Sequence, residues 1–198
     1  MCPMATALDF VGDRWTILII RELLGGPARF QELKSGLPGV ATNLLTERLR
    51  RMESDGIVRR VESGGSSLYA LTQAGAGIRT AIEELGIWAA RMGRVGPAPH
   101  ERSARSIAMA LQAILVRSTD RLPADSKVLE LDMGGEYLEI VIGRRPTVTV
   151  RTSVQPDARA TTDAAAMAKL LAGEIRAVEA IGHVAGDPDA TASLVTTL

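Results

Sequence analysis

The chain of 198 residues is poor in the side chains from which metal and redox sites are usually built. It has one cysteine, Cys2, and two histidines, His100 and His183. A single cysteine excludes a disulfide within the chain and any multi-cysteine metal site. Neither histidine has a second histidine near it in the sequence, and few paired acids lie nearby. We therefore expect no metal site and no bound cofactor.

Long apolar runs are also missing. A run such as Thr16–Ile20 is far too short to span a bilayer. Met1 leads directly into a helical pattern, not into a basic leader with a small-residue cleavage site. The 46% hydrophobic and 23% charged residues are typical of a globular protein. These features predict a cytoplasmic protein with no membrane partner.

Charge of one sign is not in excess, since 23 Lys and Arg balance 23 Asp and Glu. Residues 1–95 carry 12 Lys and Arg and 10 Asp and Glu, a net charge of +2, and residues 96–198 carry 11 and 13, a net charge of −2. Neither half is a polybasic tail, which argues against indiscriminate coating of nucleic acid. Any DNA binding must come from charge placed locally on one face.

The segment Arg94–Pro99, which reads RVGPAP, divides the sequence. Glycine and proline in this density fit neither helix nor sheet. Before the segment the pattern is helical with one hairpin, and after it β-branched alternating runs stand among helices. We predict an α+β protein with one domain over residues 1–95 and another over residues 100–198.

The first domain shows the order helix, helix, short helix, turn, helix, hairpin, helix. A serine-glycine tip separates the two strands, and Thr42 and Thr72 are suited to cap the helices that follow them. The predicted elements are helices Met4–Val11, Arg14–Leu23 and Phe30–Ser35, the turn Leu37–Gly39, a helix from Thr42 to Asp55, strands Ile57–Glu62 and Ser67–Leu71, and a helix from Thr72 to about Met92.

The helix from Thr42 has an apolar stripe formed by Leu45, Leu49 and Met52, at spacings of four and three residues. At about 100° per residue, the polar side chains of this helix then lie away from the core. They are Asn43, Thr46, Glu47, Arg50 and Arg51.

A helix that exposes such a face after a turn can enter the major groove, with its N-terminal residues nearest the bases. Asparagine can pair bidentately with adenine and arginine with guanine, and the helix N-terminus favours a phosphate. We expect Arg29 and Lys34 to clamp a phosphate and the hairpin to follow the backbone or minor groove. The predicted DNA-binding residues are Arg29, Lys34, Thr42, Asn43, Thr46, Glu47, Arg50, Arg51, Arg59, Arg60, Gly64 and Ser66.

The alternative interpretation is a solvated helix with ordinary pairs four residues apart, such as Glu47 with Arg51. For any single arginine, this alternative explains the exposed position as well as DNA contact does. The order of the elements is harder to explain in that way.

Residues from Cys2 to about Gly93 resemble the HxlR family of bacterial winged helix-turn-helix regulators, relatives of the MarR group. The resemblance implies a non-enzymatic homodimer, paired through the first and last helices of the domain, that binds a pseudo-palindromic operator in double-stranded DNA. The stretches that carry it are Cys2-Pro3, Gly12–Trp15, Arg29–Leu33, Leu37–Val40, Asn43–Leu49, Glu53–Val58 and Tyr69–Thr72.

Composition also fits a dimer. Ile78, Ile82, Leu85 and Trp88 recur at helical spacing and form a stripe that a domain of this size has difficulty burying alone. Dimerisation would place two recognition helices about 34 Å apart, one turn of DNA. The alternative is that the stripe packs on the second region.

Cys2 has two interpretations. Some HxlR-type proteins with an N-terminal Cys-Pro sense oxidants or electrophiles, and a thiol near a helix start is more reactive. With no second cysteine in the chain, sensing here would need a bond between subunits or an adduct with a small thiol. A buried structural cysteine is the interpretation we favour from the sequence.

Residues 100–198 contain no catalytic set, no P-loop and no dinucleotide fingerprint, so we do not expect an enzyme. They predict an α/β module: a helix over Arg102–Ser118, strands over 128–132, 137–142 and 147–151, alanine-rich helices after Ala158–Thr162, a strand over Gly182–Asp187 and a helix from Pro188.

The segment from Asp163 to Asp187 is similar to the C-terminal part of sterol-carrier-protein-like domains. There a helix, a Gly turn, a short helix, a strand ending in Gly-Asp and a last helix cover a sheet and frame an apolar tunnel. The resemblance implies an apolar effector, or else a role in shaping the dimer. The expected lining is Met109, Leu111, Leu115, Met167, Leu170 and Leu171, and the alternative is that these residues are only core.

Two other classes of function compete with a regulator. One is a carrier of lipids or other hydrophobic ligands whose N-terminal domain serves only for dimerisation. The other, an accessory to an acyltransferase or hydrolase, lacks a visible nucleophile–base pair.

Overall fold

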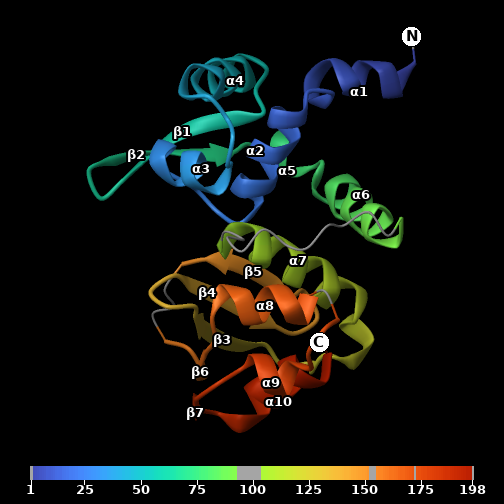
Figure 1. Ribbon diagram of the computed structural model, residues 1–198, viewed down its shortest axis with the longest axis vertical. Helices are drawn as coiled ribbons and strands as arrows, with labels where there is room; N and C mark the ends of the chain where they lie inside the picture. Colours follow the sequence, from blue (N-terminus) through green and yellow to red (C-terminus); the bar gives the residue numbers. More distant parts are fainter. Residues whose placement is uncertain (1, 93–103, 152–154, 172, 198) are drawn as a thin grey trace. The chain divides into compact units, whose positions relative to one another are not determined.

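The computed structural model describes residues 2–92, 104–151, 155–171 and 173–197. The chain divides into two compact units, Met1–Arg94 and Val95–Leu198, and each is described by itself (Figure 1). The Gly/Pro segment Arg94–Pro99 and His100 lie outside the described residues. Within the described ranges, every helix is too short or too polar to cross a bilayer.

The first unit, blue to green in Figure 1, is a helical domain with one hairpin. Helices α1 to α4 precede the hairpin, and α5 and α6 follow it. The elements are α1 (Pro3–Val11), α2 (Arg14–Leu24), α3 (Phe30–Gly36), α4 (Thr42–Ser54), β1 (Val58–Ser63), β2 (Ser66–Leu71), α5 (Gln73–Ala76) and α6 (Arg79–Arg91).

The core of this unit lies between α2 and α4. Leu45, Leu49 and Met52 are each at most 1% exposed, and Ile19 and Ile20 of α2 are fully buried. The predicted apolar stripe of α4 is therefore confirmed. Burying side chains of this size stabilises the fold by about 1.5–3 kcal/mol each, which fixes the face that α4 turns outward.

Two predictions about helix ends in the first unit are wrong. Thr42 is the first helical residue of α4, and Ala41 takes the N-cap position without a side-chain bond. Val40 is buried at the end of the turn, and Ala41, the next residue, has the extended backbone of an N-cap. The predicted helix from Thr72 to Met92 is two helices, because α5 ends at Gly77, a poor helix former. Thr72 does cap α5, since its hydroxyl accepts from the Gly75 N–H at 3.1 Å.

The hairpin is a regular antiparallel pair, with its strands within one residue of the predicted bounds. The pair Ser63 and Ser66 encloses a two-residue turn of Gly64 and Gly65, whose φ angles are +57° and +73°. Two positive φ values in succession define the type I′ turn and favour glycine at both places. The tip is therefore a tight turn that projects from the unit (Figure 1).

The second unit, yellow-green to red in Figure 1, consists of helices and a five-stranded sheet. Together with the first unit, this agrees with the predicted α+β class. The elements are α7 (Ala104–Arg117), the 3-10 helix η1 (Thr119–Arg121), β3 (Lys127–Asp132), β4 (Tyr137–Ile142), β5 (Thr147–Val150), β6 (Ala158–Thr161), α8 (Ala164–Leu171), α9 (Ala177–Ala180), β7 (Val184–Gly186) and α10 (Pro188–Thr197).

The strand order is β5-β4-β3-β6-β7, with β3 and β6 parallel and the other pairs antiparallel. Alternate residues such as Leu129, Ile140 and Ala160 are buried in one core with the helices. Glu130 and Glu139, which alternate onto the opposite face, pair directly across β3 and β4. Arginines cover them: Arg159 pairs with Glu130 and Arg151 with Glu139.

The residues predicted to line an effector tunnel belong mainly to this core. Leu111, Leu115 and Met167 are fully buried in it, and Leu170 is nearly so. Leu171 packs against the core from outside, and Met109 is half-buried. Core packing, the alternative interpretation, accounts for these side chains.

Candidate nucleic-acid interface

The outward face of α4 is narrow and polar. At 100° per residue, Asn43, Glu47 and Arg50 fall within an arc of about 60°, and all three are exposed. Asn43 lies in the first turn, and Arg50 follows it by about 10 Å along the axis. Thr42, at the start of the helix, is exposed as well. Four of the predicted residues therefore lie on or beside one accessible surface.

Two arginines near this surface have no partner among the residues that the structure describes. Arg50 on α4 and Arg59 on β1 are exposed, and neither takes part in an ion pair or side-chain hydrogen bond there. An arginine without a partner keeps its five donors for a ligand. Arg50 and Arg59 are thus the cations most free to meet a phosphate or a base.

Thr46 and Arg51 are engaged within the domain, contrary to the prediction. The Thr46 hydroxyl donates to the carbonyl of Thr42 at 2.9 Å. The Arg51 Nη2 donates to the carbonyl of Asp9 in α1 at 3.1 Å, and its Nε lies 3.6 Å from Asp55. The contacts of Thr46 with Thr42 and of Arg51 with Asp55 lie within α4 and its C-cap. Only the contact with Asp9 comes from a distant helix, and the pattern of α4 alone does not encode it.

The alternative pair of Glu47 with Arg51 is wrong as well. Glu47 lies 3.7 Å from Arg48 instead, and Arg51 turns toward the C-terminal end of its own helix.

The two cations predicted to clamp a phosphate behave differently from each other. Lys34 is half-buried and donates to the carbonyl of Val40. It therefore closes the turn between α3 and α4, so part of the ammonium that was predicted to hold a phosphate is engaged within the domain. Arg29 is exposed and reaches from the start of α3 to the hairpin, where its Nη2 donates to the Ser66 hydroxyl at 3.2 Å.

Arg60 is held in place on the hairpin. Its Nε donates to Glu53 at 2.9 Å, and its guanidinium lies 5.2 Å from the centre of the Tyr69 ring. The bond to the Glu53 carboxylate raises the pKa of Arg60 further. The contact joins the end of α4 to the hairpin. Gly64, at the tip of the same hairpin, is exposed.

Asp13 positions α4 from a distance, a role that the sequence patterns did not indicate. It caps α2, accepting from the N–H groups of Trp15 and Thr16 at 3.0 and 3.1 Å. The same oxygen lies 3.2 Å from Nε of Arg48, on the inner side of α4. Asp13 and Arg48 thus join the start of α2 to the middle of α4, and a cap of this kind is worth about 1 kcal/mol.

The predicted dimer stripe on α6 is split between two environments. Ile82 is 5% exposed and Ile78 is half-buried, whereas Leu85 and Trp88 are 52% and 60% exposed. Ile82 therefore belongs to the interior, and the outward stripe continues instead to Met92. On α1 the exposed apolar side chains are Met4, Leu8 and Phe10.

Cys2 is exposed, so the expectation of a buried structural thiol is wrong. Pro3 begins α1 and leaves Cys2 at the N-cap position. Hydrogen bonds from the backbone N–H groups of Ala5 and Met4 lower the pKa of the thiol below its ordinary value.

Comparison with known proteins agrees with this geometry. A model of the HxlR-like helix-turn-helix family matches residues 10–96. The HTH-type transcriptional regulator YodB of Bacillus subtilis is 37% identical over 93 residues, which are 45% of this chain and 83% of YodB. YvaP, another HTH-type transcriptional regulator of that organism, is 36% identical over 45% of this chain and 86% of its own length.

Solved structures show the same extent of similarity. The reduced form of YodB is 34% identical, with a TM-score of 0.43, and the match covers 48% of this chain and 98% of that one. All of these matches leave the second unit largely uncovered. Because the relatives are named as transcriptional regulators, the alternative of a ligand carrier is not favoured.

Proposed function

The chain belongs to the HxlR-like helix-turn-helix family, and from this premise we propose that it is a homodimeric transcription regulator that reads a pseudo-palindromic operator. Residues 1–95 are the DNA-binding domain of this proposal. The observation that carries it is the exposed polar face of α4, with Asn43 and Arg50 in line above a fully buried stripe. A helix fixed in this way presents the same side chains to every operator.

Each part of the surface has its own task in the proposal. Asn43 reads a base edge in the major groove, and Thr42 holds a phosphate at the positive end of α4. Glu47 is placed to accept from a cytosine amino group. Arg50 and Arg59 contact phosphates. Arg29, Arg60, Gly64 and Ser66 bring the hairpin against the neighbouring backbone or minor groove.

Selecting bound fragments from random DNA with the purified chain tests the proposal directly. We expect an enriched sequence with two inverted half-sites, whose centres lie about one helical turn apart. Enrichment of a single unrepeated site, or of no sequence, would argue against a dimeric reader.

The substitution Arg59→Ala should weaken binding to cognate and random DNA alike. Log affinity falls linearly with log salt concentration, and each lost phosphate contact makes this slope less steep by about 0.9, hence by about 1.8 in a dimer. The measurement is a salt titration of DNA affinity. Arg144→Ala, at an exposed arginine of the second unit, is the matched control and should leave the slope unchanged. An unaltered slope in Arg59→Ala would remove this residue from the interface.

The dimer in this proposal forms through α1 and α6. Two helices of one small unit expose large apolar side chains, Met4 and Leu8 on α1 and Leu85, Trp88 and Met92 on α6. Exposed apolar patches on this scale mark protein interaction sites. A second copy would bring the same two helices across a two-fold axis.

Residues 100–198 form a sterol-carrier-like domain in this proposal, with an apolar effector or the shape of the dimer as its task. The order of elements supports the resemblance. After α8 come Gly173, with a φ of +74°, the short helix α9, strand β7 ending at Gly186, and α10. Thermal stabilisation by an acyl chain or a sterol would support the effector role, and its absence would leave only an architectural one.

Cys2 is the proposed redox group. Its thiolate can add to the carbon–carbon double bond of an α,β-unsaturated carbonyl compound, which opens and takes a proton from water, to form a thioether. Alternatively, two Cys2 thiolates of a dimer can be oxidised to one disulfide by a peroxide, whose O–O bond takes the two electrons and, with two protons, breaks to two hydroxyl-bearing products. Because the pKa is lowered, alkylation of the native protein by iodoacetamide should reach half its limiting rate below the ordinary pKa of a cysteine thiol. A midpoint at or above that value would contradict the proposal, and Cys2→Ser should not be labelled.

A further inference from the structure

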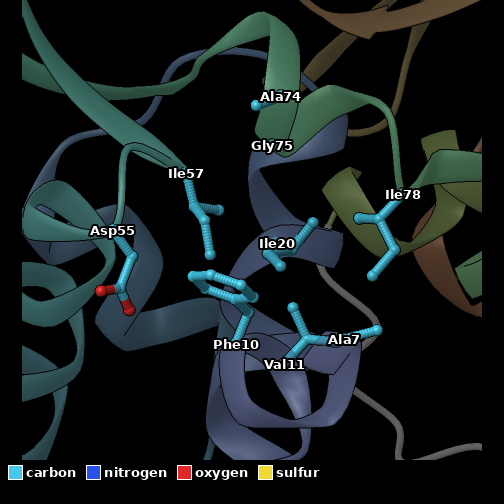
Figure 2. A pocket seen from close by; sticks show the side chains of 9 residues that line it. All are labelled: Ala7, Phe10, Val11, Ile20, Asp55, Ile57, Ala74, Gly75 and Ile78. Carbon is cyan, nitrogen blue, oxygen red and sulfur yellow. The ribbon is translucent and has the colours of Figure 1, made fainter. Parts of the chain in front are cut away.

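The first unit contains a cavity of about 280 Å³ that the proposed DNA contacts do not use. It lies where α1, α2, α5 and the segment between α4 and β1 meet, and Figure 2 shows the side chains around it. The lining residues are Ala7, Phe10, Val11, Ile20, Asp55, Ile57, Ala74, Gly75 and Ile78.

The cavity has a closed floor and an accessible rim. Ile20 and Ile57 form the floor and are 0% and 8% exposed. Phe10, whose ring lies beside Ile57 in Figure 2, is 46% exposed, and Ala7 is exposed too. In a single protomer the cavity therefore opens on the α1 side. At about 30 Å³ for each water-sized group, the space suits about nine non-hydrogen atoms.

One lining residue is charged, Asp55; it lies at the edge of the cavity, with its carboxylate turned away from the apolar side chains in Figure 2 and 3.6 Å from Arg51. The remaining lining side chains are apolar and offer water few partners. A carboxylate accepts hydrogen bonds and disfavours an anion beside it. The chemistry of the wall thus selects a small apolar body that carries a hydroxyl or amine donor.

Asp55 also belongs to the end of the recognition helix. It is the C-cap of α4, and its N–H donates to the carbonyls of Arg51 and Glu53. Its carboxylate lies 3.6 Å from Arg51, which donates to the carbonyl of Asp9 at the end of α1. A ligand at the edge of the cavity that donates a hydrogen bond to the Asp55 carboxylate would compete with Arg51 for that carboxylate.

We propose that this cavity binds a small apolar alcohol, phenol or amine, and that its occupancy weakens operator binding. The first part stands on the cavity alone, and the second rests on the proposed function. With Asp55 engaged by the ligand, Arg51 keeps only one of its two contacts, the bond to the Asp9 carbonyl, so the end of the recognition helix is held less firmly. Thermodynamic linkage then requires operator DNA to lower the affinity for the ligand by the same factor by which the ligand lowers the affinity for DNA, typically 5- to 150-fold.

Calorimetric titration of the full chain without DNA tests the binding site. The probes are 4-methylphenol and benzylamine, with benzoate as an anion of similar size. We expect the first two to bind. The affinity of benzoate should be at least about tenfold lower, because a bond to a charged acceptor is lost. Ala7→Leu adds three carbons and leaves room for about six non-hydrogen atoms, fewer than the eight of either probe, so it should abolish binding. Ala5→Leu, on the same helix but outside the lining, should not.

Charge at the rim is tested by Asp55→Asn. This change should remove the preference for benzylamine over benzoate and keep 4-methylphenol, since an amide oxygen still accepts. Asp9→Asn, which removes an exposed carboxylate that does not line the cavity, is the matched control and should behave as the parent chain.

Three results would overturn the binding site. Failure of every probe to bind is the first, and binding that survives Ala7→Leu, which would place the site elsewhere, is the second. The third is a change of molecular mass in Ala7→Leu without any probe binding, which would assign the cavity to a side chain of a second copy. If probes bind and operator affinity stays the same, the regulatory part fails while the DNA-binding proposal stands.

Discussion

Replacing Asn43 with alanine is expected to remove the preference for one base in each half-site while leaving the protein folded. Asn43 is exposed in the first turn of α4, so its amide carries no packing that the fold would miss. A bidentate contact from asparagine to adenine is worth about 1–3 kcal/mol, or about 5- to 150-fold in affinity for each half-site. In a dimer with two identical contacts the loss doubles in free energy.

The measurement compares affinity for the selected operator with affinity for random DNA, at one salt concentration. Asn43→Ala should bring the two affinities together, mainly by lowering the first. Gln73→Ala removes another exposed amide, from α5, and serves as the matched control, with no expected change. An Asn43→Ala protein that loses affinity for both DNAs by the same factor would show that this side chain contacts phosphate and does not read a base.

Arg50 and Arg51 show why neighbouring residues of one helix need separate tests. Both were predicted on the outward face of α4 from the spacing of its apolar stripe. Arg50 has no partner in the described part of the chain, whereas Arg51 is bound to the carbonyl of Asp9 and lies near Asp55. The contact with α1 is a tertiary one, and helix periodicity gives no access to it.

Local patterns were sufficient for most elements of the first unit. The stripe of Leu45, Leu49 and Met52 and the Gly64-Gly65 turn both follow from near-neighbour chemistry, and both agree with the structure. The contact of Lys34 with a backbone carbonyl in the turn was not predicted. The sequence shows that this residue is basic, but it does not show whether the side chain faces solvent or closes a turn.

The second unit shows where hydrophobic patterning fails. Strand β6, with the sequence ARAT, lies between β3 and β7, although no strand was predicted there. Its inward residues, Ala158 and Ala160, are too small and too weakly apolar to stand out as strand residues. Both are almost fully buried in the common core, where small side chains fit between the sheet and the helices.

The cavity of the first unit depends on contacts among distant segments. Phe10, Asp55 and Ile78 come from three parts of the chain, and no spacing in the sequence joins them. From the neighbouring sequence, Phe10 is one more apolar residue of an amphipathic helix. Only the packing of α1 beside the end of α4 makes it part of the cavity wall.

Replacing Trp88 with glutamate is expected to convert the dimer into monomers and to abolish tight operator binding. Trp88 is 60% exposed on α6, between Leu85 and Met92, which are also exposed. A tryptophan at the centre of an interface commonly contributes 2–4 kcal/mol, and each dimer loses two of them. The substitution also places two carboxylates in an apolar contact, where an unpaired charge is costly. Because Trp88 is not needed for the core around α2 and α4, each monomer should remain folded.

Molecular mass from light scattering at micromolar concentration decides the oligomeric state, and far-UV circular dichroism checks the fold. Thr80→Glu introduces the same charge at an exposed position near the start of α6 and should stay dimeric. A monomer contacts one half-site at a time, so its affinity for the full operator should fall to that for an isolated half-site. Should Trp88→Glu keep the mass of a dimer, the stripe would face another surface, and the second unit of the same chain would become the first candidate. Two recognition helices then could not owe their spacing to α6, and the operator geometry would have to come from elsewhere in the protein.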